Sequence, residues 1–139
     1  MEFKWGFLGN YIDSISERGY ENLDEVILVN TSDIFNGEVL NNKKVKNENL
    51  KGQFKKSFKN GDILFSEIRP ANKRFARINF DSKLYIASTK LMVLRNKSDA
   101  ILTDYIYYFL TSNETLRYLQ DQAESRSGTF PQITFNNIC

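Results

Sequence analysis

Four cations follow one apolar stretch and are the side chains in this sequence best placed for chemistry. Arg69 stands directly before Pro70, and Lys73, Arg74 and Arg77 follow within eight residues of it. The proline disfavours a helical backbone at Arg69, so the arginine is held with little freedom. A guanidinium can grip a phosphate or a guanine edge through two parallel hydrogen bonds. Flexible lysines that could anchor phosphates precede the stretch: Lys43, Lys44, Lys46, Lys55, Lys56 and Lys59.

The cations are concentrated in one part of the chain, although the formal net charge is only +2. Residues 43–77 carry eleven cations against three anions, whereas residues 1–42 carry two against eight and residues 78–139 carry six against six. Such a one-sided field suits a polyanionic partner. Two plainer interpretations stay open. The segment can be a core strand that runs into a solvated basic hairpin, or Arg69 can bond Glu67 or Asp62 and brace the strand end.

The composition excludes several kinds of active site. Histidine is absent and Cys139 is the single cysteine, so the usual zinc ligands and the base of a Ser-His-Asp triad are missing. The seven glycines are too scattered for a phosphate-binding loop. We therefore expect no catalytic residues, no metal and no cofactor. An enzyme would have to use Asp62 and Glu67, but side chains five residues apart on a strand point to opposite faces.

The length of the chain predicts a single domain, residues 1–139, that can bury a core of its own. Cys139 has no partner in the chain, which fits a reducing compartment. No run approaches a membrane span, and residues 1–6 lack the features of a signal peptide. We expect a cytoplasmic protein that does not contact a membrane.

The elements that must position the cations are short strands followed by two helices. Turn residues at 60–62 precede an apolar strand over residues 61–68, which delivers Arg69. Other strands are predicted over residues 11–16, 26–29 and 91–94, and segments 75–80 and 83–87 read as a hairpin about Asp81-Ser82. Residues 36–53 are polar and read as loop, with Asn47 capping a short helical turn.

The apolar spacing changes from the strand to the helix period near residue 102. Leu102, Tyr105, Ile106, Phe109 and Leu110 form one helical face behind a Thr103 cap. Ser112 and Asn113 interrupt the helix, and a second stripe follows at Leu116, Leu119, Gln120 and Ala123. Tyr107, Tyr108 and Tyr118 are expected to cover the core. The tail, residues 125–139, begins as a polar loop and continues as an extended segment.

Four motifs in this order resemble the target recognition domain of type I restriction-modification specificity subunits. They are GDILFS at 61–66 with Ile68-Arg69-Pro70, IAST at 86–89 with Leu91, Val93 and Leu94, YFL at 108–110, and SGTFPQIT at 127–134. Each motif alone is weak, but their order and spacing match over nearly the whole chain. The resemblance implies an α+β domain with a mixed, twisted, partly barrel-like sheet and C-terminal helices.

The resemblance also implies a function without catalysis. Family members carry two such domains separated by long helices, read the two halves of a split double-stranded DNA sequence, and dock methyltransferase and restriction (translocase) subunits. This chain has one domain and stops where a spacer helix would begin, which suggests a fragment or a half-subunit that pairs with a second copy. Base-reading loops differ within the family, so the DNA-binding candidates rest on physical grounds.

The candidates include a second polar loop besides the cations named above. Arg126, Ser127 and Thr129 lie in it, although the Ser and Thr can equally be structural turn residues. The alternative to DNA recognition is a protein-interaction module, or a DNA-binding fragment that works without restriction-modification partners. In the first of these, the basic segment would meet an acidic partner or the acidic first third of another copy.

Overall fold

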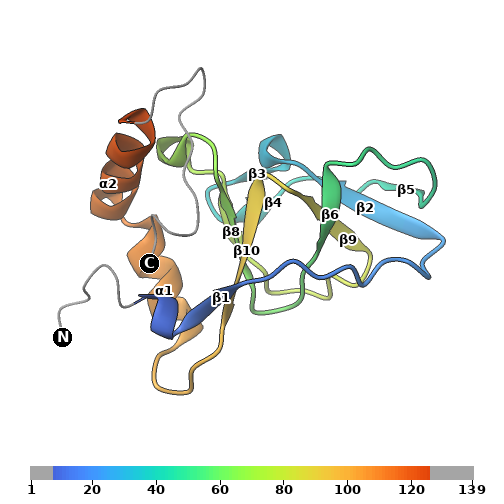
Figure 1. Ribbon diagram of the computed structural model, residues 1–139. Helices are drawn as coiled ribbons and strands as arrows, with labels where there is room; N and C mark the ends of the chain where they lie inside the picture. Colours follow the sequence, from blue (N-terminus) through green and yellow to red (C-terminus); the bar gives the residue numbers. More distant parts are fainter. Residues whose placement is uncertain (1–7, 126–139) are drawn as a thin grey trace.

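The computed structural model describes residues 8–125, which fold into two four-stranded β-sheets, a two-stranded hairpin and two helices (Figure 1). The first sheet has the order β1-β10-β7-β8 and is antiparallel throughout. Its strands are β1 (Ile12–Ser14), β7 (Ile63–Ser66), β8 (Phe75–Arg77) and β10 (Leu91–Asn96). Helices α1 (Thr103–Thr111) and α2 (Asn113–Glu124) lie on one side of this sheet.

The second sheet has the order β5-β2-β9-β6 and is mixed, because β2 and β9 run parallel. Its strands are β2 (Glu25–Val29), β5 (Lys44–Lys46), β6 (Phe54–Ser57) and β9 (Tyr85–Ser88). A separate hairpin is formed by β3 (Ile34–Phe35) and β4 (Glu38–Val39). Three short 3-10 turns complete the fold: η1 (Leu8–Asn10), η2 (Thr31–Asp33) and η3 (Pro70–Asn72).

The apolar runs of β7 and β10 are continuous because both faces of the first sheet are covered. Ile63 and Phe65 pack with Ile106 and Leu110 of α1 on one face. Leu64 belongs to the cluster between the two sheets, together with Leu91, Val93, Val29 and Ala87. A third cluster on the outer face of the second sheet is covered by Tyr20, Leu23 and Leu50. A strand buried on both faces has no polar side to alternate with.

The predicted fold class is confirmed: a mixed sheet is followed by two C-terminal helices. Within residues 8–125 the two sheets stay separate and no closed barrel forms. The expected strands at 11–16, 26–29, 61–68 and 91–94 correspond to β1, β2, β7 and β10. Ser112 separates the helices as expected and caps α2, since its hydroxyl accepts a hydrogen bond from the Thr115 amide.

The predicted hairpin about Asp81-Ser82 is wrong. β8 pairs with β7 in the first sheet, and β9 lies between β2 and β6 in the second. The buried Ser82 hydroxyl donates to the Phe58 carbonyl, 2.6 Å away, and holds the connection between the sheets. Alternation of apolar residues predicted both strands correctly, but it carries no information about which strand is the partner.

Several local predictions are also wrong. Asn47 caps no helical turn, because its side-chain amide donates to the carbonyls of Tyr20 and Leu23. Thr103 is the first residue of α1 rather than its cap. Of the three tyrosines expected to cover the core, Tyr107 does pack against it, but Tyr108 is 71% exposed and Tyr118 40%. Leu102, expected on the buried face of α1, is 75% exposed because it lies before the first turn.

Candidate nucleic-acid interface

The chain turns sharply after β7, and two cations stand at the turn with left-handed backbones. We call residues 69–74 the basic corner. Arg69 has φ 46° and ψ 70°, and Lys73 has φ 59° and ψ 36°, on either side of η3. Positive φ is uncommon outside glycine and costs roughly 1–3 kcal/mol per residue. Pro70 does keep Arg69 out of the right-handed helical region, as predicted, but the backbone is left-handed rather than extended.

The surrounding structure enforces this strained geometry. The Ser66 hydroxyl accepts a hydrogen bond from the Ile68 amide and donates one to the Ile68 carbonyl. Pro70 is buried, and the Ala71 amide donates to the Gln120 side chain of α2 at 3.1 Å. The Lys73 carbonyl accepts from the Asn36 amide at 2.7 Å. Arg69 and Lys73 are both exposed, so a rigid backbone presents two cations to solvent.

The β3–β4 hairpin supports the corner from the other side. Its two-residue turn is Asn36-Gly37, with φ 44° and 102°, which is the turn chemistry that hairpins favour. The Gly37 amide donates to the Phe75 carbonyl at 2.9 Å. The prediction of loop over residues 36–53 is wrong at β4 and β5, and the Asn-Gly pair is the sequence signal for this hairpin.

Arg74 is held inside this arrangement. One guanidinium nitrogen donates to the Ile34 carbonyl at 3.1 Å, and the guanidinium carbon lies 5.3 Å from the centre of the Phe35 ring. The arginine therefore joins the basic corner to the hairpin through a hydrogen bond and a cation–π contact. Its charge still contributes to the local field.

Arg77 pairs with Asp104 of α1 and fastens the helix to β8. Its Nε atom is buried and has no hydrogen-bond partner among the described residues. Tyr107 lies close to Arg77. Burial and the neighbouring Tyr108 raise the pKa of Tyr107, and the charge of Arg77 lowers it. The main contact of Arg77 is thus within the protein.

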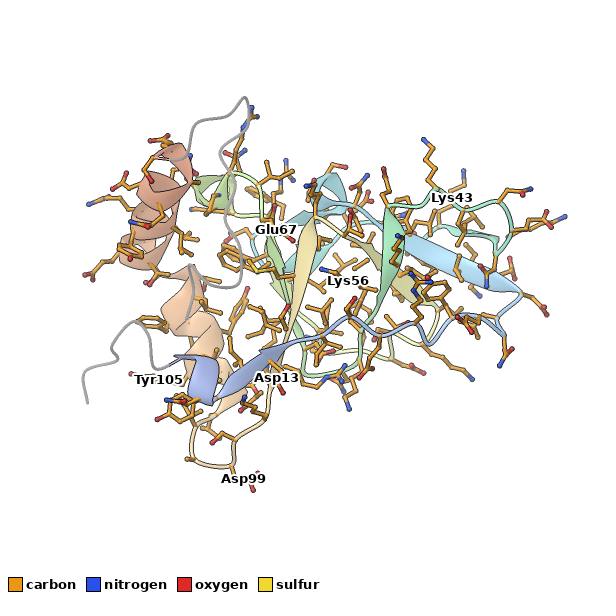
Figure 2. All side chains as sticks on the ribbon, in the orientation of Figure 1. Asp13, Lys43, Lys56, Glu67, Asp99 and Tyr105 are labelled. Carbon is orange, nitrogen blue, oxygen red and sulfur yellow. The ribbon has the colours of Figure 1, made fainter. Side chains whose placement is uncertain are left out.

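Lys56 belongs to β6 and is half-buried, and Figure 2 shows its side chain between β6 and β10. Its ammonium group donates to the carbonyls of Leu91 at 2.9 Å and Thr89 at 3.4 Å. Burial lowers the pKa of Lys56, and the nearby Glu67 carboxylate opposes that shift. Burial also raises the pKa of Glu67, whereas the positive charges of Lys56 and Lys90 lower it.

The remaining predicted cations are exposed but do not form one compact group. Lys43, Lys44 and Lys46 lie at and beside β5, whereas Lys55 lies on β6, and these strands are opposite edges of the second sheet. Lys59 is in the turn before β7. Arg126, Ser127 and Thr129 fall outside the described residues.

A shallow pocket of about 290 Å³ lies where the chain crosses between β5 and β6. Lys55 lines it together with Arg18, Lys51 and the ring of Tyr20. Neither Arg18 nor Lys51 is among the cations predicted from the sequence. Arg18 lies far from the basic segment in sequence, whereas Lys51 lies within residues 43–77. A second pocket, of about 390 Å³, brings Lys59 together with Lys83.

The catalytic alternative finds no support in the positions of Asp62 and Glu67. Both Asp62 oxygens bind the Arg95 guanidinium, at 2.9 Å each, and Glu17 binds a third nitrogen at 3.0 Å. Asp62 and Glu67 stand at opposite ends of β7, which puts them roughly 16 Å apart at 3.3 Å per residue.

In the described part of the chain, no three acidic, histidine or cysteine side chains could hold a metal ion. No helix there is long and apolar enough to span a membrane.

Comparisons with known proteins agree on one family. The model of the type I restriction modification DNA specificity domain matches residues 15–138. The HindI type I restriction enzyme specificity subunit of Haemophilus influenzae is 42% identical over 132 residues, which are 94% of this chain and 29% of that subunit. The chain therefore spans less than a third of this relative.

Two solved structures share the fold. The HsdS subunit from Thermoanaerobacter tengcongensis superposes with a TM-score of 0.79 at 22% identity, over 97% of this chain and 35% of that one. A second structure, described as the structural basis of complex assembly and conformational transition of the type I R-M system, superposes with a TM-score of 0.77 at 20% identity. The superposition covers 97% of this chain and 35% of that one. At these identities the likeness concerns the fold.

Proposed function

The chain belongs to the family of type I restriction-modification DNA specificity domains, and from this premise we propose that it is one target recognition domain that reads half of a split duplex DNA sequence. The observation that carries the proposal is the basic corner. Two exposed cations sit there on strained backbones that neighbouring elements enforce. Strain of this kind is retained where the geometry serves a function.

The exposed cations divide into two roles. Arg69 reads a base edge, because a guanidinium on a fixed backbone can form the bidentate fork that recognises guanine. Lys43, Lys44, Lys46, Lys55, Lys59 and Lys73 contact phosphates and position the duplex. Arg126, Ser127 and Thr129 remain proposed contacts of the second loop. Arg74, Arg77 and Lys56 hold the scaffold, which is the role their internal contacts favour.

The relatives support a proposal about the wider setting. We propose that residues 1–139 are one domain of a longer specificity subunit that acts in the cytoplasm. Methyltransferase and restriction subunits dock on that subunit and supply the catalysis, and a second recognition domain or a second copy reads the other half-sequence. The domain itself needs no cofactor.

Binding to duplex DNA should be weak and strongly dependent on salt. If about five phosphates are neutralised, the plot of log affinity against log salt concentration has a slope of about −4 to −5. Fluorescence anisotropy with a labelled random duplex from low to moderate salt measures it. A flat response would contradict the proposal, and salt-sensitive self-association without DNA would favour the protein-interaction alternative instead.

The neighbouring residues Lys55 and Lys56 should respond differently to substitution. Lys55→Ala removes an exposed charge and should weaken binding to all duplexes, lowering the salt slope by about one. Lys56→Met leaves the carbonyls of Thr89 and Leu91 without their charged donor, which should cost about 1–3 kcal/mol of unfolding free energy. Anisotropy and urea unfolding of both variants check this. Equal losses of DNA affinity with unchanged stability would show that Lys56 also reaches the duplex.

A further inference from the structure

Phe35 is an exposed aromatic ring held in a defined position beside the basic corner. It is 46% exposed, while Ile34 before it is fully buried in the cluster between the sheets. Strand alternation therefore points the Phe35 ring outward. Single exposed apolar side chains are common on protein surfaces, and what distinguishes Phe35 is its fixed position beside the cations of the basic corner.

The ring is fixed from several directions. The Arg74 guanidinium lies over it and is itself tied to the carbonyl of Ile34. The next residue, Asn36, donates its amide hydrogen to the Lys73 carbonyl at 2.7 Å. The tight turn at Gly37 fits closely against α1, since a Cβ there would lie 3.3 Å from the Tyr107 hydroxyl. Ordering this ring on binding would thus cost little conformational entropy.

We propose that Phe35 contacts a base step of the bound duplex and contributes to sequence selection, with Arg74 as its positioning residue. The inference rests on the proposed function. The occupant is inferred from charge: the Arg74 guanidinium lies over the ring, and the residue after Phe35 bonds to the Lys73 carbonyl. Both cations belong to the basic corner, a surface suited to the phosphates on either side of a base step. Apolar side chains read thymine methyl groups or wedge between bases when cations hold the backbone nearby.

The plainer alternative is that Phe35 only shields the stem of Arg74. The two interpretations predict different effects of Phe35→Ala on DNA binding. On our proposal, selection from randomised duplexes at low salt should lose its preference at one or two adjacent base pairs. Affinity for the duplex selected by the unsubstituted protein should fall about tenfold. The salt slope and the affinity for random duplex should stay unchanged, because no charge is removed.

Leu40→Ala is the matched control, since Leu40 is another exposed apolar side chain on the same segment, 56% exposed. It should leave the selected sequence unaltered. Phe35→Tyr keeps the ring and should retain the preference, and Arg74→Lys should lose it as Phe35→Ala does. If thermal melting shows that Phe35→Ala is unfolded, Phe35→Thr removes the ring but keeps a residue with high strand propensity, and it gives the same comparison.

A 2-aminopurine placed at the affected step gives an independent signal. Its fluorescence should change on binding of the unsubstituted protein and respond much less to Phe35→Ala. An unchanged selected sequence with affinity within twofold for folded Phe35→Ala would overturn the inference. If Arg69→Ala then still relaxed selection, the proposed function would stand without it. If the unsubstituted chain selected no sequence at all, both would fail.

Discussion

Replacement of Asp62 by alanine is expected to lower the free energy of unfolding by about 3–5 kcal/mol, because it removes both hydrogen bonds of Arg95 to a buried carboxylate and leaves the guanidinium only the exposed Glu17 as a partner. The Asp62 side chain is 1% exposed and that of Arg95 20%. Asp62 also accepts a hydrogen bond from the Lys59 amide at 2.9 Å, which closes the turn before β7. Urea unfolding followed by circular dichroism measures the loss.

The exposed pair between Lys97 and Asp13 is the matched control. Its side chains are 43% and 54% exposed, so Asp13→Ala should change the unfolding free energy by about 1 kcal/mol or less. Similar small losses in both variants would show that the Asp62–Arg95 pair behaves as a surface ion pair. The expected large difference would identify it as the contact that fixes the start of β7.

Arg69→Ala is expected to relax the DNA sequence that the domain selects, at one base pair. Loss of a bidentate contact to guanine removes about 1–3 kcal/mol of discrimination against the wrong base. Arg69→Lys should relax selection as well, since an ammonium group keeps the charge but lacks the planar fork. Randomised-duplex selection at low salt gives the base pattern, and anisotropy gives the salt slope, which Arg69→Lys should leave unchanged.

Lys73 provides the comparison because it is the other left-handed cation of the corner. Lys73→Asn removes the charge but suits positive φ, which asparagine tolerates. It should weaken binding to all sequences alike and lower the salt slope by about one. The competing hypothesis is that Arg69 braces the strand end. If Arg69→Ala melts at a markedly lower temperature and selects the same base pattern as the unsubstituted protein, Arg69 stabilises the strand end and does not read a base.

Local patterns in the sequence were sufficient to predict the type of most elements. The apolar runs at β7 and β10 and the helical stripes of α1 and α2 depend on residues close in the chain. Gly61, with φ 95°, forms the turn that its neighbours predicted. Pro70 excluded a right-handed helix at Arg69 for a steric reason that acts between adjacent residues. The order of the motifs was also sufficient to identify the family.

Tertiary structure alone decided which strands pair and which cations remain exposed. The segment at β9 joined β2 and β6 rather than its neighbour β8, because partner choice depends on burial across both sheets. Lys56 and Arg74 are held by carbonyls 33 to 40 residues away in the chain. A charge pattern in sequence gives the density of cations, but the backbone carbonyls and carboxylates that engage them are brought close only by folding. The sequence therefore determined that residues 43–77 are dense in cations, and the tertiary structure decided that Arg69 and Lys73 lie exposed on a rigid corner.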